Sequence, residues 1–345
     1  MIRVAVARVE GQELFGVHTN AIDELRKFAD VHVMKLERPH DEEHVARALR
    51  GFDAVIAEPI LPRFGRRFFE LNGDVRLIYL NGRGYDNVDV EAAEKRGVIV
   101  ARAPCHCEAE AVAVHSVALL LLLARKVLAA SSFARSGRWA REGFYSLGEL
   151  LSRDLRRMTI GIIGFGCIGS RTAEILSRGF GIRRLLVYDP YVPRGAVEDR
   201  GFTYVEDLNV LLAESDAILV HAELNCTTYH MLDGRAFERM KDGAILVNTA
   251  RGAIVDTRAL VKYLASGKVG AAALDVVEGE PIGPDHPLLS LDNVVVTPHV
   301  AFATREAVEC MDREAVRAVE CFATGNCEVE ERVRPRALRC GLSSF

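Results

Sequence analysis

Short apolar runs alternate with amphipathic stretches of helical length along most of the chain. The first hundred residues contain apolar runs at 2–7, 31–34, 54–57, 77–80 and 98–100, and helical patterns lie between them, for example at 21–29 and 42–49. Alternation of strand-type and helix-type segments is typical of a parallel sheet with crossover helices. We therefore expect this block to form one small α/β domain.

A second and longer series of apolar runs begins at residue 159. It comprises the segments 159–163, 185–188, 217–221, 244–248, 270–274 and 294–297, with helical patterns between them such as 256–266, which is followed by Gly267. A glycine at that place commonly ends a helix. The series predicts a doubly wound sheet of six strands. The last amphipathic pattern, 304–323, has no strand after it and is expected to pack back on the first domain.

Composition narrows the class of protein. A chain of 345 residues is long enough for about two domains. With 49% hydrophobic and 27% charged residues and a mean hydropathy of +0.09, it has enough apolar surface to exclude a disordered protein. The formal net charge of -4 provides no basic field for nucleic acid or an anionic membrane. Recognition of a small molecule is the expectation.

Targeting signals are not evident in the pattern. The N-terminus lacks a long apolar run, so we expect a cytoplasmic protein. The most apolar stretch, 109–130, is interrupted by polar residues including Glu110, Arg125 and Lys126, and its unbroken core 117–124 is too short to span a bilayer. A helix buried at a domain junction or subunit contact is expected there. The arginine-rich tail 328–345, with Arg332, Arg334, Arg336 and Arg339, is expected to be frayed or to contact another subunit.

The eight cysteines form no Cys-x-x-Cys pair. Cys105-His106-Cys107 is too tight to offer zinc two well-spaced thiolates by itself, so no metal site is expected. In a cytosolic protein the cysteines are expected to be reduced and mostly buried. The four late ones, Cys310, Cys321, Cys327 and Cys340, could pair if the source is a hyperthermophile.

A glycine-rich turn follows the strand predicted at 159–163. It reads Gly164-Phe165-Gly166-Cys167-Ile168-Gly169, and a helix is predicted at 170–177. The first glycine allows the turn, the second lets the backbone approach a pyrophosphate, and the third permits close packing of helix on strand. Asp189 ends the next strand, where a carboxylate binds ribose hydroxyls and repels the extra phosphate of NADP. The pattern predicts a dinucleotide site that favours NAD.

Three predicted strand ends carry ionisable residues. Arg251 follows the strand at 244–248, Glu280 follows the strand at 270–274, and His299 follows the strand at 294–297. Ligands in open α/β sheets bind at this edge. Reduction of a 2-keto acid needs a guanidinium fork for the carboxylate, a proton donor for the carbonyl and an acid beside that donor. These three residues could supply that chemistry.

Several of these motifs together resemble the D-isomer-specific 2-hydroxyacid dehydrogenase family over about residues 77–325. The family pattern around its arginine stands here as Asn248, Arg251, Gly252, Val255 and Asp256, and Thr297-Pro298-His299 matches as well. The resemblance implies an α/β fold of two doubly wound parallel-sheet domains. A Rossmann-type NAD-binding domain, 104–299, would be inserted into a flavodoxin-like substrate domain made of 1–103 and 300–330, leaving 331–345 as a tail.

The resemblance also implies an activity and residue roles. The protein would be an NAD-dependent D-2-hydroxyacid dehydrogenase that reduces a 2-keto acid with NADH. Arg251 would bind the substrate carboxylate, His299 would protonate the carbonyl oxygen, and Glu280 would hydrogen-bond His299 and keep it protonated. The residues implied to contact the cofactor are Gly164, Gly166, Cys167, Ile168, Gly169, Asp189, Ala222, Thr228, Thr249 and Asp275. Those implied to bind the substrate are Gly82, Arg83, Gly84 and Phe302.

Phe302 and the run Tyr229-His230-Met231 favour the D-lactate and D-2-hydroxyisocaproate dehydrogenase branch, with a pyruvate-like or bulkier apolar substrate. Alternatives are a glyoxylate or hydroxypyruvate reductase, a 3-phosphoglycerate dehydrogenase, and a non-enzymatic NAD(H)-sensing scaffold like the corepressors that share the fold. The chain departs from the family pattern at Ile60, His106, Val114 and Glu223. His115 and His230 are interpreted as structural. The resemblance and the apolar segment 111–128 imply a homodimer formed through the cofactor domain.

Overall fold

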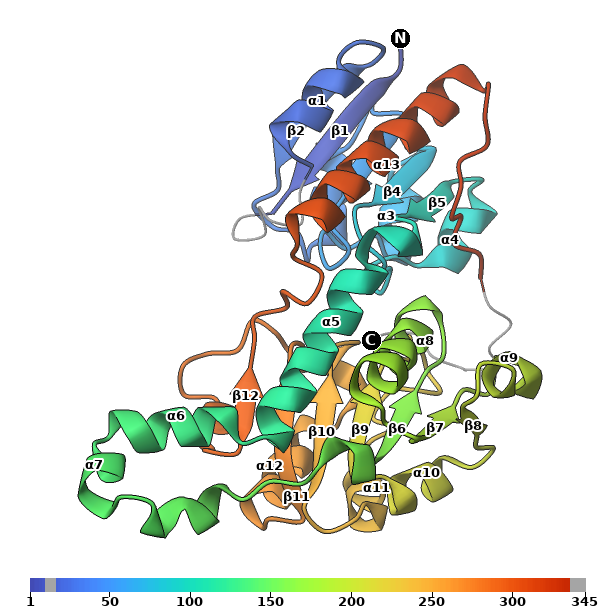
Figure 1. Cartoon of the computed structure of the whole chain (residues 1–345). Coiled ribbons are helices and arrows are strands. Elements are labelled where there is room, and N and C mark those ends of the chain that lie inside the picture. Colours follow the sequence, from blue (N-terminus) through green and yellow to red (C-terminus); the bar gives the residue numbers. More distant parts are fainter. Residues whose placement is uncertain (10–16, 336–345) are drawn as a thin grey trace. The chain divides into compact units, whose positions relative to one another are not determined.

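The computed structural model describes residues 1–9 and 17–335, and within it the chain forms two compact units (Figure 1). Unit 1 consists of Met1–Glu108 and the described part of Ala303–Arg339, whereas unit 2 consists of Ala109–Phe302. The expected domain limits were residues 103 and 299. Each unit has its own parallel sheet and its own core, and each is described by itself below.

Unit 1 contains a parallel sheet of five strands in the order β2-β1-β3-β4-β5. The strands are β1 (Arg3–Arg8), β2 (Asp30–Lys35), β3 (Ala54–Ala57), β4 (Leu77–Leu80) and β5 (Ile99–Arg102). All five predicted strands are present, and β3 and β4 have the predicted limits because both are apolar at every position and completely buried. This strand order is that of flavodoxin-like doubly wound folds.

Helices cover both faces of this sheet (Figure 1). They are α1 (Thr19–Leu25), α2 (Glu42–Ala48), α3 (Arg66–Leu71), α4 (Val90–Lys95) and α13 (Arg305–Thr324). Asp41 caps α2 by accepting hydrogen bonds from the backbone of Glu43 and His44, and Thr304 caps α13 through Ala307. Ala315 and Val319 of α13 share one core with strands of the N-terminal block. The predicted return of this helix to the first block is confirmed.

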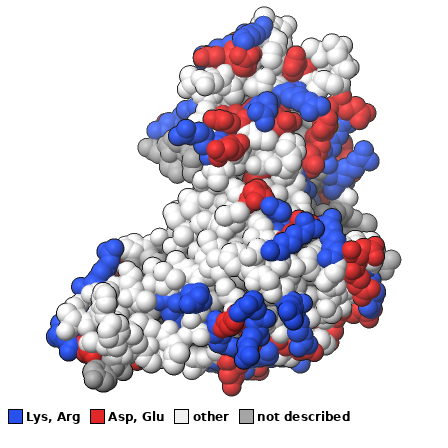
Figure 2. Space-filling view, viewed as in Figure 1, with Lys and Arg blue, Asp and Glu red and all other residues white. Residues whose placement is uncertain are grey.

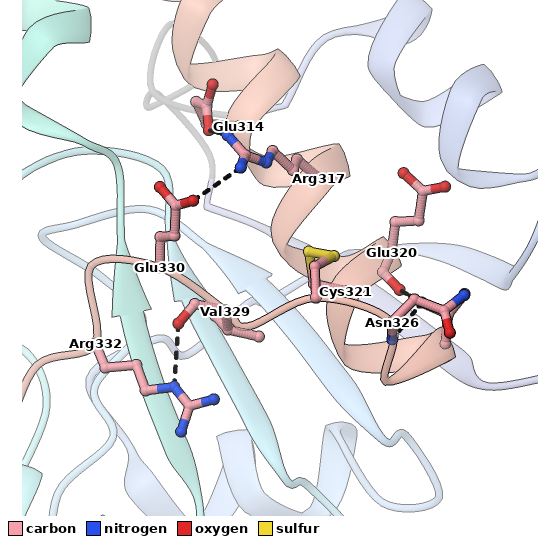
Figure 3. Close-up of a disulfide and its surroundings, with 10 residues drawn as sticks. Glu314, Arg317, Glu320, Cys321, Asn326, Val329, Glu330 and Arg332 are labelled. Carbon is pink, nitrogen blue, oxygen red and sulfur yellow. Dashed lines mark hydrogen bonds and ion pairs between the residues drawn. A yellow bond between two sulfur atoms is a disulfide. The ribbon is translucent and has the colours of Figure 1, made fainter.

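The segment after α13 runs beside the edge strand β5. A disulfide joins Cys321 to Cys327 where the helix ends (Figure 3). Farther along, the backbone N–H of Arg102 donates to the carbonyl of Glu331, and that of Val333 donates to Val100. The expectation of a frayed tail is therefore wrong for the described residues up to 335, because their backbone groups pair with an otherwise open strand edge. Arg336 and Arg339 lie outside the described residues.

Unit 2 contains a parallel sheet of seven strands in the order β12-β11-β10-β9-β6-β7-β8. The strands are β6 (Thr159–Ile163), β7 (Arg184–Tyr188), β8 (Thr203–Tyr204), β9 (Ala217–Val220), β10 (Ala244–Asn248), β11 (Val269–Leu274) and β12 (Val294–Val296). Six were predicted. The seventh, β8, is a two-residue edge strand whose side chains are exposed or half-buried, so it leaves no apolar run in the sequence.

The helices of unit 2 pack on both faces of its sheet. They are α5 (Cys105–Ala124), which begins in unit 1, α6 (Val127–Arg135), α7 (Arg138–Glu142), α8 (Cys167–Glu174), α9 (Arg194–Glu198), α10 (Leu208–Glu214), α11 (Gly234–Arg239) and α12 (Thr257–Ala265). By length and composition alone α5 could cross a membrane, but 61% of its most apolar window is buried inside the protein. Its residues Val117 and Leu120 pack against Ile160 and Leu219 of the sheet, as in a core helix.

The cysteines differ from expectation. Cys107 is disulfide-bonded to Cys310 and Cys321 to Cys327, and Cys105, Cys167 and Cys226 also take part in disulfides. The expectation of reduced thiols is wrong for these residues. Sequence spacing cannot reveal the Cys107–Cys310 pair, because 203 residues separate its members and only the return of α13 brings them together.

Charged side chains of both signs are interspersed on the molecular face drawn in Figure 2. Among the described residues, arginines after β3 pair with acidic side chains: Arg63 with Glu42, and Arg67 with Glu43 and Glu70. Such exposed pairs contribute little to stability. They form a solvated helix face.

Candidate active site

The glycine-rich turn connects β6 to α8. Gly164 has a φ of +90°, in the left-handed region that favours glycine, and a Cβ there would lie 2.6 Å from the backbone nitrogen of Ala222. A Cβ on Gly169 would lie 2.0 Å from the carbonyl oxygen of Gly164. Beside Gly166, in contrast, no atom of the described residues lies within 4 Å of a Cβ, apart from its chain neighbours. The turn therefore packs tightly at its first and third glycines and leaves open space at the second, where α8 begins.

Asp189 follows β7 beside this turn. One of its carboxylate oxygens accepts a hydrogen bond of 2.8 Å from the backbone of Phe165, and the other accepts one of 2.9 Å from Tyr191. The two contacts fix the carboxylate next to the glycine turn. A fixed carboxylate at this place suits the hydroxyls of an adenosine ribose.

His221 directly follows β9 and lies next to the same turn. A Cβ on Gly169 would be 3.5 Å from the Cβ of His221. Both ring nitrogens are buried without a hydrogen-bond partner among the described residues, and burial lowers the pKa of His221 to about 4. The ring is thus neutral at pH 7 and offers one donor and one acceptor. Unsatisfied polar atoms beside a glycine turn fit a bound polar group such as a dinucleotide.

The predicted catalytic residues follow three adjacent strands. Asn248 of β10 pairs with Leu274 of β11, which pairs with Val296 of β12, so the three carboxyl ends lie at one edge of the sheet. A Cβ on Gly252, in the loop of Arg251, would lie 2.1 Å from the backbone carbon of Val277. The loops after β10 and β11 are therefore in close contact.

His299 and Glu280 form the central pair of the site. Nδ1 of His299 lies 2.5 Å from Oε1 of Glu280, while Oε2 of Glu280 accepts the backbone N–H of Val277 at 3.0 Å. The backbone of His299 has a φ of +55°, a strained conformation for a non-glycine residue. A carboxylate on Nδ1 stabilises the protonated ring and leaves Nε2–H as a proton donor.

Asp275 holds the loop that carries His299. Its side chain is almost completely buried and accepts hydrogen bonds from Thr297 Oγ1 at 2.6 Å, Val300 N at 2.9 Å and Ala301 N at 2.8 Å. Its backbone carbonyl also accepts the N–H of His299. The resemblance implied a cofactor contact for Asp275, and the structure adds this positioning role.

Asn248 shapes the loop of Arg251. Its amide donates to the carbonyl of Arg251 at 2.9 Å, and its side-chain oxygen accepts the N–H of Ala250 at 3.0 Å. Nη1 of Arg251 donates to the carbonyl of Ala250 at 2.7 Å. In the same loop, Thr249 shares a hydrogen bond of 2.6 Å with Ser116 of α5.

Comparisons with known proteins agree with this geometry. Residues 117–301 match the family model described as the D-isomer specific 2-hydroxyacid dehydrogenase, NAD binding domain. The glyoxylate reductase of Aeropyrum pernix is 38% identical over 311 residues, which cover 90% of this chain and 91% of that protein. The chain belongs to the D-isomer specific 2-hydroxyacid dehydrogenase family. The resemblance stated from the sequence motifs is confirmed.

Other members of the family that match this chain are named for different substrates. The D-3-phosphoglycerate dehydrogenase of Archaeoglobus fulgidus is 37% identical over 84% of this chain, but the chain spans about half, 53%, of that protein. The D-lactate dehydrogenase of Aquifex aeolicus, solved with NAD and lactic acid, superposes with a TM-score of 0.82 at 28% identity, covering 98% of this chain and 100% of that one. These comparisons do not confirm the D-lactate branch, because members named for different substrates match.

The residues of unit 2 fit the family's cofactor, NAD. The open space at Gly166, the fixed carboxylate of Asp189 and the unpartnered ring of His221 lie around the end of β6 and its neighbours. Thr228 has a different local role, because its hydroxyl donates to the carbonyl of Glu223 and accepts the N–H of Asn225. It closes the turn after β9. The other implied cofactor residues, Cys167, Ile168 and Ala222, lie in or beside the glycine turn.

Three side chains near the site were missed by sequence reasoning. Nε2 of His115, on α5, lies 3.2 Å from Thr297 Oγ1, and Ser116 binds Thr249 as described. Nε2 of His230 lies 2.7 Å from Glu278, two residues before Glu280. His115 and His230 were interpreted as structural because a lone histidine is more often structural than catalytic. Their positions depend on tertiary packing that no local pattern records.

The implied substrate residues Gly82, Arg83 and Gly84 lie in unit 1, after β4. There Nη1 of Arg83 donates to Glu331 at 2.8 Å and to the carbonyl of Ala103 at 3.0 Å. Phe302 ends unit 2 and is buried. The structure thus brings Arg251, Glu280 and His299 to one sheet edge of unit 2, whereas the loop after β4 belongs to the other unit.

Proposed function

We propose that this family member reduces a small 2-oxo acid to the D-2-hydroxy acid with NADH. The observation that carries the proposal is the His299–Glu280 pair at 2.5 Å, on the same sheet edge as Arg251. NADH supplies the hydride when it is bound. The remaining work of the reaction belongs to the protein's own side chains.

Each side chain has a distinct task. The guanidinium of Arg251 binds the substrate carboxylate through two parallel hydrogen bonds and so orients the carbonyl. Nε2–H of His299 donates a proton to the carbonyl oxygen as negative charge develops there. Glu280 contacts Nδ1 and so keeps the imidazole ring oriented, with Nε2 directed to the substrate. In the direction of oxidation the same nitrogen accepts the proton from the hydroxyl.

The preference for NADH over NADPH rests on Asp189. Its carboxylate is held beside the glycine turn by two backbone N–H groups, so it cannot swing away without losing both. A phosphate on the ribose would meet this negative charge. We expect a clear preference for NADH.

Two kinds of substrate side chain are candidates. Phe302 favours an apolar group, as in pyruvate or 2-oxoisocaproate. The glyoxylate reductases of Aeropyrum pernix and Pyrococcus furiosus, each 38% identical to this chain, favour glyoxylate as the second candidate. Steady-state kinetics on pyruvate, 2-oxoisocaproate, glyoxylate, hydroxypyruvate and 3-phosphohydroxypyruvate, with NADH and NADPH in parallel, separates these substrates. Binding of NADH without reduction of any of them would favour the scaffold interpretation.

We also propose that the enzyme is a homodimer. Large apolar side chains are exposed along the extension of unit 2 that contains α6 and α7 (Figure 1). They are Val127, Leu128, Trp139, Phe144 and Leu151. Large apolar side chains exposed together on one extension are typical of an interface, and a second copy of the chain would cover them. Light scattering at micromolar concentration tests this, and a monomer would exclude it. At the same concentration, the Trp139→Glu variant should contain more monomer than the wild type.

A further inference from the structure

The Cys107–Cys310 disulfide joins two segments of unit 1 that are far apart in the chain. Cys107 stands near the end of Met1–Glu108, whereas Cys310 stands near the beginning of the second segment, in α13. Both cysteines are buried. The disulfide therefore links the two segments of unit 1 covalently, and in the sequence unit 2 lies between these segments.

An imidazole lies beside this bridge. A ring nitrogen of His106 and the two sulfur atoms of Cys107 and Cys310 all lie within 4.8 Å of one another. Two ligand atoms on the same zinc ion lie about 3.5–4 Å apart, since zinc–sulfur and zinc–nitrogen bonds are about 2.3 and 2.0–2.1 Å long. Only a small movement separates these three atoms from a metal-binding arrangement.

The chemistry of the three groups depends on the state of the sulfurs. In the disulfide neither sulfur carries the negative charge that makes a thiolate a strong ligand. After reduction, two thiolates and one imidazole form a donor set that favours zinc and related thiophilic cations. Sequence reasoning considered Cys105-His106-Cys107 alone and found it too tight. The fold adds the sulfur of Cys310, from α13, which becomes a separate thiolate on reduction.

We propose that reduction of the Cys107–Cys310 disulfide opens a Cys2His site for Zn²⁺, with His106 as the third protein ligand. A dithiol reductant gives two electrons and two protons to the disulfide, the S–S bond breaks, and the reductant leaves as its own disulfide. Zn²⁺ then displaces the two thiol protons to solvent and keeps its oxidation state. Water takes the fourth position. The two segments of unit 1 thus remain linked in both redox states.

The experiment uses the full chain and Co²⁺ as an optical probe for the zinc site. The protein is reduced with a phosphine, desalted without oxygen and titrated with Co²⁺, and Zn²⁺ is then added in competition. We expect one tightly bound ion per chain with a thiolate-to-cobalt charge-transfer band, which Zn²⁺ abolishes. The oxidised protein should show no such band. A band of equal strength in the oxidised protein would overturn the proposal.

Variants identify the ligands. Cys107→Ser and Cys310→Ser should lose the band, and His106→Asn should weaken Co²⁺ binding by at least about tenfold, since even loss of an outer-sphere partner weakens metal binding by about that factor. Two controls should retain it. Cys105→Ser removes the cysteine two residues before Cys107, and the double variant Cys321→Ser with Cys327→Ser removes the Cys321–Cys327 disulfide (Figure 3). Retention in Cys310→Ser, or loss in Cys105→Ser, would contradict the assignment.

Thiol protection gives a test on the wild-type chain, independent of how the variants fold. Reduced protein is alkylated with and without Zn²⁺, and the labelled cysteines are identified by peptide mass. Zn²⁺ should slow alkylation of Cys107 and Cys310 but not of Cys321 and Cys327. Equal labelling of all four with and without Zn²⁺ would show that the reduced pair holds no metal.

Discussion

Nδ1 of His299 lies 2.5 Å from Oε1 of Glu280, and the other oxygen of that carboxylate is fixed by the backbone of Val277. This geometry determines which nitrogen faces the reaction. Because Nδ1 is occupied by the carboxylate, Nε2 carries the proton that can be transferred. The backbone of His299 is strained, and its loop is held by Asp275, so the ring is oriented from both sides.

Glu280→Gln should slow reduction while leaving NADH binding unchanged. The amide can still hydrogen-bond Nδ1, but it brings no negative charge to stabilise the protonated ring. We expect kcat to fall by about 10²-fold or more, within the range of general acid–base contributions. Stopped-flow and steady-state rates measure kcat, and titration of the protein's fluorescence measures NADH binding.

Glu278→Gln is the matched control for that variant. It removes a carboxylate two residues away in the same loop, one that pairs with His230 rather than His299. Its kcat should stay near the wild-type value. If both variants lost kcat equally, the rate would depend on the total negative charge of this loop and not on the contact between His299 and Glu280.

Arg251→Lys should lower kcat/KM by more than about 10²-fold, because a point charge cannot replace the bidentate fork and the substrate carbonyl loses its orientation. Arg258→Lys, on the exposed face of α12, is the control and should have no effect. Kinetics with the best oxo acid of the panel provide the measurement. A lysine variant with unchanged kcat/KM would remove Arg251 from the site.

Much of the fold was predictable because its strands are strongly apolar. Strands β3, β4, β6 and β10 have the predicted limits. For β3, β4 and β10 the reason is that polar or glycine residues flank the apolar run on both sides. The two-residue strand β8 was not predictable, because half-buried side chains leave no pattern. The path of the chain after α13 was also missed, since its pairing with β5 uses backbone groups that carry no sequence signal.

The part of the site that was predictable consists of side chains just after the carboxyl ends of neighbouring parallel strands. Arg251, Glu280 and His299 stand at fixed offsets from β10, β11 and β12, and parallel pairing places them on one edge. Contacts between distant segments were not predictable. His115 reaches Thr297 across 182 residues, and no spacing rule connects them.

Asp275→Asn should destabilise unit 2 and displace His299. The carboxylate accepts three hydrogen bonds from the loop at 297–301, whereas an amide would turn an N–H group toward a backbone N–H that needs an acceptor. A buried mismatch of this kind costs about 1–3 kcal/mol. Urea unfolding should show this loss together with a lower kcat. Asp207→Asn, which keeps a good cap on the exposed start of α10, should change neither.

His221 should make the stability of unit 2 fall as the medium becomes acidic. Burial lowers the pKa of His221 to about 4, while an unfolded chain binds the same proton near pH 6.5. Below about pH 6.5 the unfolded state therefore holds more protons, so unfolding becomes easier until the pH approaches 4. At pH 5 the free energy of unfolding is lower by about 2 kcal/mol for this reason.

Urea unfolding at pH 7.5 and at pH 5 tests this prediction. The loss of stability between the two pH values should be smaller in His221→Asn than in the wild type. In His40→Asn, which alters an exposed histidine, the loss should equal that of the wild type. Because NADH would satisfy the ring nitrogens only in the folded state, saturating NADH should also stabilise the wild type more than His221→Asn. Equal pH dependence in the wild type and His221→Asn would show that the buried ring is not the group that titrates.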